Sequence, residues 1–150
     1  MRYPENFICL SYKTIDFLIP EKKVVTAGCS GENLIYMGEK LLTVDFDKAL
    51  AELNFLKTTA ADSEDKKIKT SIIMKNEGLV ENAGCYALLT SSDCRVSSLT
   101  LDVFSLFEEP WASLKKNGLL ACTFYDDKIA YLIDCNLLLG KLKNERTVAL

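Results

Sequence analysis

The sequence feature that most constrains the fold is a pattern that occurs twice. An apolar, strand-like run ends at an aspartate and is followed by a short apolar, helix-like stretch. The run 40–44 ends at Asp45, and the run 129–133 ends at Asp134. Aspartate is a favoured helix N-cap because its carboxylate accepts hydrogen bonds from free backbone N–H groups. The repeat predicts two similar hairpin-to-helix units, although two junctions of independent origin would give the same pattern.

Strand signals in the first third of the chain are short and closely spaced. They lie at 7–12, 15–19, 24–25 and 34–36, and the gaps leave no room for the crossover helices of an α/β sheet. A small antiparallel barrel is therefore expected. The second half carries further strand signals, at 71–74, 85–90, 94–101, 119–125 and 128–133. Helices are expected at 46–56 and near 135–142.

The domain organisation follows from a polar stretch near the middle of the chain. Residues 57–69 carry charges of both signs and indicate an exposed linker. The halves on either side are small for independent cores, so they should dock. We expect a single domain over 1–150, with one subdomain formed by 1–56 and the C-terminal helix 134–143, and the other by 70–133.

Composition excludes several classes of function. The net charge is −3, the isoelectric point is near 5.1, and the only arginines are Arg2, Arg95 and Arg146, so binding to nucleic acid is not expected. The N-terminal residues lack the apolar core of a signal peptide, and no apolar run approaches the length of a membrane span. The sequence therefore predicts a cytoplasmic protein without membrane insertion.

Catalytic chemistry has little support in the sequence. The chain has no histidine, which removes the commonest general acid–base residue and metal ligand. Its six cysteines lie in apolar runs without a C-x-x-C pair, which favours buried small side chains over disulfides or metal ligands. We expect no enzyme activity, metal or cofactor. A thiol enzyme or redox sensor remains an alternative, with Cys122 activated by Lys128 as one example.

The order of elements resembles the CheW-like chemotaxis adaptor family over about residues 7–142. The strands 7–12 and 15–20, with Val24 and Val25 after Pro20, are similar to that family's opening hairpin and the segment after it. The run 34–46 is similar to its most recognisable stretch, in which an Arg-Gly turn precedes an apolar strand that ends at an aspartate. The second half of the family pattern is matched by 85–90, 96–101, 118–121 and 132–134.

The resemblance implies a mainly β fold of two small five-stranded β-barrels packed side by side, with short helices after Asp45 and Asp134. It also implies a scaffold without catalysis. Members of the family bridge the histidine kinase CheA to the cytoplasmic tips of chemoreceptors. One barrel binds the kinase's homologous regulatory domain, and an apolar groove between the barrels binds the receptor. The partners expected for this chain are a CheA-type histidine kinase and a chemoreceptor cytoplasmic domain.

Position in the family pattern and proximity to turns single out six candidate contact residues: Val24, Val25, Leu34, Tyr36, Met37 and Gly38. Burial in the barrel core is the alternative for the five that carry apolar side chains. The chain departs from the pattern at two places, because Met37 replaces the arginine of the Arg-Gly turn and Thr43 replaces a proline. Loss of the guanidinium removes charge-assisted hydrogen bonds, so we expect either that receptor or kinase pairing differs from that of the usual adaptor or that the chain is a paralogue serving another array.

A ligand-binding regulatory module is the alternative function. Its pocket would lie between the two barrels and be lined by Cys85, Phe104 or Trp111.

Overall fold

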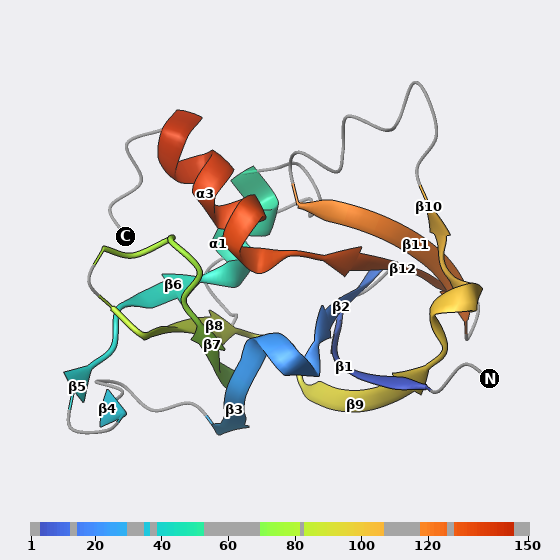
Figure 1. Ribbon diagram of the computed structural model, residues 1–150, viewed down its shortest axis with the longest axis horizontal. Coiled ribbons are helices and arrows are strands. Elements are labelled where there is room, and N and C mark those ends of the chain that lie inside the picture. Colours follow the sequence, from blue (N-terminus) through green and yellow to red (C-terminus); the bar gives the residue numbers. More distant parts are fainter. Residues whose placement is uncertain are drawn as a thin grey trace.

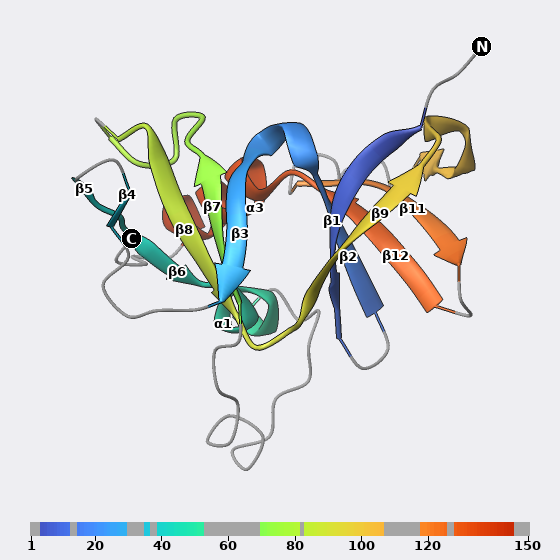
Figure 2. The same cartoon turned by 90° about the horizontal axis from the view of Figure 1, so that it is seen from below.

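The structure, a computed structural model, describes residues 4–12, 15–29, 35–36, 39–52, 70–81, 83–106, 118–125 and 128–145. Within these residues the strands form a six-stranded sheet, a four-stranded sheet and a two-stranded hairpin. The two larger sheets lie side by side, as both views show (Figures 1 and 2). The fold is thus mainly β, as the sequence predicts.

The six-stranded sheet has the order β10-β11-β12-β2-β1-β9. Its strands in chain order are β1 (Glu5–Ser11), β2 (Ile15–Pro20), β9 (Cys94–Leu99), β10 (Ser105–Leu106), β11 (Leu119–Tyr125) and β12 (Lys128–Ile133). Neighbours are antiparallel except β12 and β2, which run parallel. The N-terminal hairpin therefore lies between strands that the second half of the chain contributes.

The four-stranded sheet has the order β3-β7-β8-β6, with β6 parallel to β8. Its strands are β3 (Val24–Cys29), β6 (Thr43–Asp45), β7 (Thr70–Lys75) and β8 (Cys85–Thr90), and the separate hairpin consists of β4 (Ile35–Tyr36) and β5 (Glu39–Lys40). The 3-10 helices η1 (Glu21–Lys23) and η2 (Leu101–Val103) follow β2 and β9, and the α-helices α1 (Phe46–Glu52) and α3 (Cys135–Glu145) follow β6 and β12.

One core joins both sheets and both α-helices. Side chains alternate across β1, so that Ile8 and Leu10 enter this core while Phe7 and Cys9 enter a second cluster on the other face. Burial on both faces explains why β1 is a continuous apolar run rather than an alternating one. The shared core contains side chains from every layer: Ile8, Leu10, Tyr12, Phe17, Ile19, Val44, Phe46, Ala49, Leu50, Ile72, Met74, Leu79, Tyr86, Leu88, Leu119, Ile133, Cys135, Leu138 and Leu139.

Both predicted aspartate caps are confirmed. The backbone N–H of Lys48 donates to Asp45 Oδ1 at 3.1 Å, and the N–H of Leu137 donates to Asp134 Oδ1 at 3.2 Å. In each unit the strand before the aspartate runs parallel to a strand from another hairpin, β6 to β8 and β12 to β2. The two junctions share a pairing pattern as well as a cap, while their origin by duplication stays a prediction.

The expectation of two five-stranded antiparallel barrels needs correction. The described sheets have six and four strands, each includes a parallel pair, and the strand order of neither is closed. In the six-stranded sheet the edges are β9 and β10, and the chain passes between them through η2 rather than pairing them directly.

Strand pairing connects the two sides of the polar stretch 57–69. Each sheet takes strands from both sides of residues 57–69, because β1 and β2 join β9–β12 while β3 and β6 join β7 and β8. The linker itself lies outside the described residues. The subdomain boundaries therefore stay a prediction.

A close backbone contact holds α3 against the six-stranded sheet. Gly118, just before β11, has φ +94°, and its carbonyl accepts a 2.7 Å hydrogen bond from the N–H of Asp134. A Cβ at Gly118 would lie 2.7 Å from the backbone nitrogen of Leu138 and 2.8 Å from the carbonyl oxygen of Asp134. Only glycine fits this place without moving the first turn of α3.

Candidate functional site

An apolar cavity of about 210 Å³ lies beside η1. Most of its wall comes from strands of the six-stranded sheet and from η2, while charged side chains stand among them. The lining residues are Glu5, Phe7, Pro20, Lys22, Lys23, Leu101, Leu120, Leu132, Ile133 and Asp134. The mixture of an apolar wall and charged groups is typical of a surface that binds one face of an amphipathic segment.

A second cavity, of about 350 Å³, lies beside the first turns of α3 and is more polar. It is lined by Glu77, Gly78, Leu79, Asp134, Asn136, Leu137 and Gly140. Asp134 lines both cavities. A third hollow of about 320 Å³ shares Glu5, Pro20 and Lys22 with the apolar cavity. We call the surface formed by the first two cavities the η1–α3 groove.

Local sequence explains why η1 lies at the groove. Strand β2 ends at Pro20, whose ring nitrogen has no hydrogen to donate to a further ladder hydrogen bond. One 3-10 turn follows, and the N–H of Val24 closes it on the carbonyl of Glu21. The chain then enters β3 of the other sheet. Glu21, Lys22 and Lys23 are thereby placed where the chain crosses from one sheet to the other (Figure 2).

The wall opposite η1 is held by hydrogen bonds around the turn after β7. Asn76 Oδ1 accepts from the N–H groups of Leu79 and Val80 at 2.9 and 3.0 Å. The N–H of Glu77 donates to Asn136 Oδ1 of α3 at 3.0 Å. This turn is thus fastened to the helix, and Glu77 is oriented toward η1.

Tyr86 and Cys135, near the start of α3, are both buried. Tyr86 is fully buried, and its hydroxyl has no hydrogen-bond partner among the described residues. Burial, together with the neighbouring Cys135 and Asp134, raises the pKa of the Tyr86 hydroxyl, and burial with the negative charge of Asp134 raises the pKa of the Cys135 thiol. Cys135 is therefore held as a neutral thiol, which is unreactive.

The residues that sequence reasoning proposed as contacts do not line the groove where they can be placed. Val24 is half-buried and packs against the shared core, and Val25 is half-buried against the cluster around Ile73. Tyr36 pairs through its backbone with Glu39 in the β4–β5 hairpin. Leu34, Met37 and Gly38 lie outside the described residues.

The groove residues that sequence reasoning missed come from distant strands. Phe7, Leu120 and Leu132 read in the sequence as ordinary strand residues, and nothing local distinguishes them from core. The one available signal was the break at Pro20, where two strand-like runs are separated by charged residues.

The alternative pocket is not assembled by the residues that can be placed. Phe104 packs edge-to-face on Phe7, with ring centroids 5.5 Å apart, in the second cluster of the six-stranded sheet. Cys85 packs in a different cluster, in the four-stranded sheet. Neither lines any of the three cavities given above, and Trp111 lies outside the described residues.

The proposed thiol pair is not brought together either. Cys122 faces Tyr131 in the β11–β12 register, whereas the Lys128 ammonium is directed at Asp16 and at the carbonyl of Tyr12. No disulfide forms among the cysteines whose side chains are described, Cys9, Cys85, Cys94, Cys122 and Cys135.

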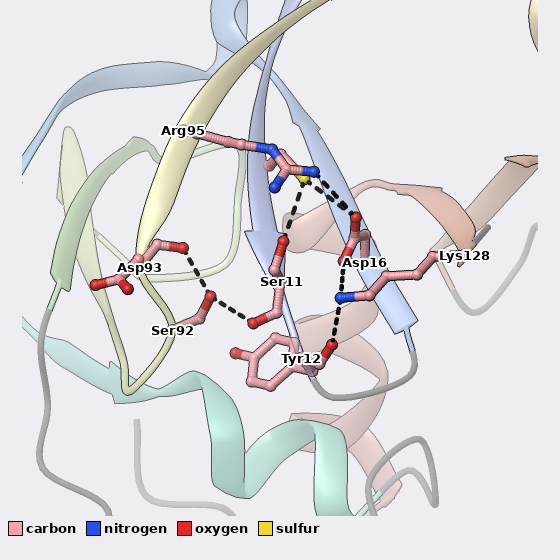
Figure 3. A network of polar contacts seen from close by, with 8 residues as sticks. Ser11, Tyr12, Asp16, Ser92, Asp93, Arg95 and Lys128 are labelled. Atoms are coloured by element: carbon pink, nitrogen blue, oxygen red, sulfur yellow. Dashed lines mark hydrogen bonds and ion pairs between the residues drawn. The ribbon is translucent and has the colours of Figure 1, made fainter. Parts of the chain in front are cut away.

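Asp16 is a buried carboxylate with two cations around it (Figure 3). Its side chain is 1% exposed, and Arg95 of β9 lies 3.3 Å from Oδ2 while Lys128 of β12 lies 3.6 Å from Oδ1. The Cys9 thiol donates to Oδ2 at 3.7 Å. A buried carboxylate needs such compensation for its lost hydration. The cluster connects β9, β1, β2 and β12, and Asp16 lines none of the three cavities.

A second polar network connects the two sheets beside α1, the helix that follows Asp45. The Tyr12 hydroxyl donates to Asp47 Oδ1 of α1 at 2.7 Å and lies 2.7 Å from Thr90 Oγ1, which also lies 2.9 Å from Asp47 Oδ1. Ser91 donates its N–H to Asp47 Oδ2 at 3.0 Å. Burial and the Asp47 carboxylate raise the pKa of Tyr12, which keeps the hydroxyl protonated as a donor.

The next turn of chain completes this connection. Ser92 Oγ lies 2.9 Å from the carbonyl oxygen of Ser11 at the end of β1 (Figure 3), and Thr70 Oγ1 donates to the carbonyl of Ser92 at 2.8 Å. Residues from both sheets and from α1 therefore share one buried set of hydrogen bonds.

Comparison with known proteins shows which fold this is. Among the solved structures that match is a crystal structure of the scaffolding protein TtCheW from Thermoanaerobacter tengcongensis, with a TM-score of 0.62 and 12% sequence identity. The match covers 92% of this chain and 89% of that chain. The chain has the fold of CheW. The resemblance that the sequence indicates is therefore confirmed at the level of the fold.

Sequence comparison alone gives no further relatives, because no family model and no curated protein matches this chain. At 12% sequence identity the two proteins share the course of the backbone, while most of their side chains differ. Within the part of the chain that the structure describes, no helix has both the length and the apolarity to cross a bilayer.

Proposed function

We propose that this chain is a non-enzymatic adaptor that couples the cytoplasmic tips of chemoreceptors to a CheA-type histidine kinase through protein–protein contacts. The observation that carries the proposal is the CheW fold along nearly the whole chain, shared with a protein described as a scaffold. The proposal places the chain in the cytoplasm, where both partners would be reached.

The η1–α3 groove is the proposed receptor site. The helical tip of a receptor would place apolar side chains against Phe7, Leu120 and Leu132, and polar ones near the lysines of η1. Leu101 is 51% exposed at the rim of the same cavity, so it is available to a partner without unfolding. An exposed leucine beside an apolar hollow is favourable for docking, because both lose water in the complex.

The residues that sequence reasoning selected remain candidate contacts for either partner, namely Val24, Val25, Leu34, Tyr36, Met37 and Gly38. Val24 and Val25 are half-buried, so truncation to alanine tests two roles at once. Loss of a contact weakens binding by more than ~1 kcal/mol with the fold intact, whereas loss of core packing lowers the free energy of unfolding by ~2–5 kcal/mol at a fully buried site.

The test uses titration calorimetry with a receptor cytoplasmic-tip fragment and with the regulatory domain of a CheA-type kinase, both from the same organism as this chain. Leu101→Glu places a charge at the rim of the apolar cavity, and Val103→Glu places the same charge on an equally exposed residue of η2 that does not line it.

We expect Leu101→Glu to weaken receptor binding about tenfold or more, while Val103→Glu and kinase binding change little. Absence of binding to both partners would contradict the adaptor function. Equal losses in the two variants would contradict the position of the receptor site.

A further inference from the structure

An ion pair connects the two cavities of the η1–α3 groove. Lys23 lines the apolar cavity, Glu77 lines the polar cavity, and Asp134 lines both. The Lys23 ammonium and Glu77 Oε1 are 2.5 Å apart. The two cavities therefore share one wall residue, and the Lys23–Glu77 contact joins a side chain of one cavity to a side chain of the other.

This contact is weak enough to be opened by a ligand. The side chains of Lys23 and Glu77 are 30% and 43% exposed, so water and salt screen their attraction. Exposed pairs of this kind contribute little to stability. The backbone on both sides is fixed independently of the pair, by the closed turn of η1 and by the hydrogen bond from Glu77 N–H to Asn136. Side-chain rotation alone is sufficient to separate them.

The charges around the pair indicate which kind of ligand would open it. Lys22 lies beside Lys23 on η1, and both line the apolar cavity. On separation, Glu77 would remain hydrated at the surface, whereas the two lysines would face the groove together. Glu5 and Asp134 line the same cavity, and the Asp134 carboxylate already accepts a hydrogen bond at the N-terminus of α3. Lys23 is the cation that loses its partner when the pair separates, so an acidic side chain placed on Lys23 would replace Glu77, whereas a basic one would meet a like charge there.

We propose that the Lys23–Glu77 ion pair is a gate across the η1–α3 groove, which a partner helix opens by placing an acidic side chain on Lys23 in place of Glu77. The identity of the partner helix as a receptor tip rests on the proposed function. The gate itself rests on the contact between Lys23 and Glu77. When the gate is open, the two cavities form one longer docking surface on either side of Asp134.

The variant that opens the gate is Glu77→Gln, which keeps the shape of the side chain and removes its charge. The matched control is Glu81→Gln, which makes the same charge change at an exposed residue of the same turn that lines neither cavity. Lys23→Gln removes the cation that the incoming acid needs. Thermal unfolding of each variant establishes that it is folded.

The first readout requires no biological partner. The probe is 1-anilinonaphthalene-8-sulfonate, which carries an anionic group beside apolar rings, and binding is followed by fluorescence and by backbone amide shifts at Leu132 and Asp134. We expect Glu77→Gln to bind it ~2- to 5-fold more tightly than the unaltered protein, the equivalent of one exposed ion pair. Glu81→Gln should bind as the unaltered protein does, and Lys23→Gln should show no gain.

The second readout repeats the titration with the receptor-tip fragment. Tighter binding by Glu77→Gln in both assays supports the gate and the receptor site together. A gain with the probe and no receptor binding by any variant supports the gate and contradicts the receptor function. Receptor binding with Glu77→Gln equal to Glu81→Gln in both assays contradicts the gate and leaves the function standing. A gain in Lys23→Gln equal to that in Glu77→Gln would contradict the role of Lys23 as the anion's partner.

Discussion

The two strand-to-helix junctions, at Asp45 and Asp134, share the same aspartate cap but differ in what surrounds it. At Asp45 the helix enters a closed set of buried hydrogen bonds, in which Asp47 accepts from Tyr12 and Ser91 and so connects the two sheets. At Asp134 the helix begins between two cavities, beside the buried Tyr86 hydroxyl, which has no hydrogen-bond partner among the described residues. The Asp45 junction therefore holds the two sheets together, whereas the Asp134 junction lines surface cavities that a partner could occupy.

The largest expected effect breaks the Asp134 junction. Gly118→Ala would place a Cβ 2.7 Å from the backbone nitrogen of Leu138, at a positive φ. We expect it to lower the free energy of unfolding in urea by about 3 kcal/mol or more, because backbone atoms must move. Gly78→Ala is the control, since its φ is +87° with nothing near the new Cβ, and it should lose only about 1–2 kcal/mol. Equal losses of unfolding free energy in the two variants would show that the first turn of α3 can move to accommodate the Cβ at little cost.

Alkaline pH should destabilise both junctions. Burial raises the pKa of Tyr12 at the first junction and of Tyr86 and Cys135 at the second. The folded protein therefore holds these protons after the unfolded chain, with pKa values of roughly 8.5 for cysteine and 10 for tyrosine, has released them. Their contribution to stability is complete below about pH 8.5 and is lost as the pH rises, by up to about 1.4 kcal/mol per pH unit for each group.

The measurement is urea unfolding at a series of pH values from 7 to 11. Above roughly pH 10, Tyr12→Phe should lessen the slope of stability against pH, since the tyrosine that releases a proton on unfolding is gone. An unchanged slope in that variant would show that Tyr12 ionises in the folded protein as it does in water.

The same substitution at the two junctions should give different results at neutral pH. Tyr12→Phe removes a hydroxyl that donates to Asp47, and we expect a loss of about 1–1.5 kcal/mol. Tyr86→Phe removes a buried hydroxyl that has no partner among the described residues, so stability should stay within about 0.5 kcal/mol or rise. Chemical denaturation of both variants makes the comparison. A larger loss at Tyr86 than at Tyr12 would reverse the contrast between the junctions.

The smallest effect concerns the caps themselves. Asp45→Ala and Asp134→Ala each remove one hydrogen bond to a helix N-terminus, and each should lower the free energy of unfolding by about 1 kcal/mol. Because only Asp134 lines the cavities, only its variant should also change receptor binding. Equal changes in binding would show that the first junction takes part in docking.

The caps were predictable from sequence because capping depends on residues three apart in the chain. The strand order was not, because it depends on contacts between distant segments. Asp16 lies opposite Ala130 in a parallel pair, and the cations that surround its carboxylate come from Arg95 and Lys128. In the sequence Asp16 is one charged residue in an apolar run, and nothing near it indicates burial.

The groove was hidden from sequence for the same reason. Its apolar wall combines Phe7, Leu101, Leu120 and Leu132, which reach one place through the pairing of β11, β12, β2, β1 and β9. The resemblance to CheW-like proteins was visible because the order of strands and turns along the chain survives when side chains change. That order indicated the fold, whereas the candidate contacts it suggested at Val24 and Val25 do not line the cavities.

The most direct test of the contrast between the junctions is an NMR titration of the isotope-labelled chain with the receptor-tip fragment, following backbone amides at both. Docking in the η1–α3 groove predicts shift changes at Leu101, Leu132 and Asp134, with Asp47 and Thr90 unchanged. Shift changes at Asp47 and Thr90 with none at Asp134 would contradict it.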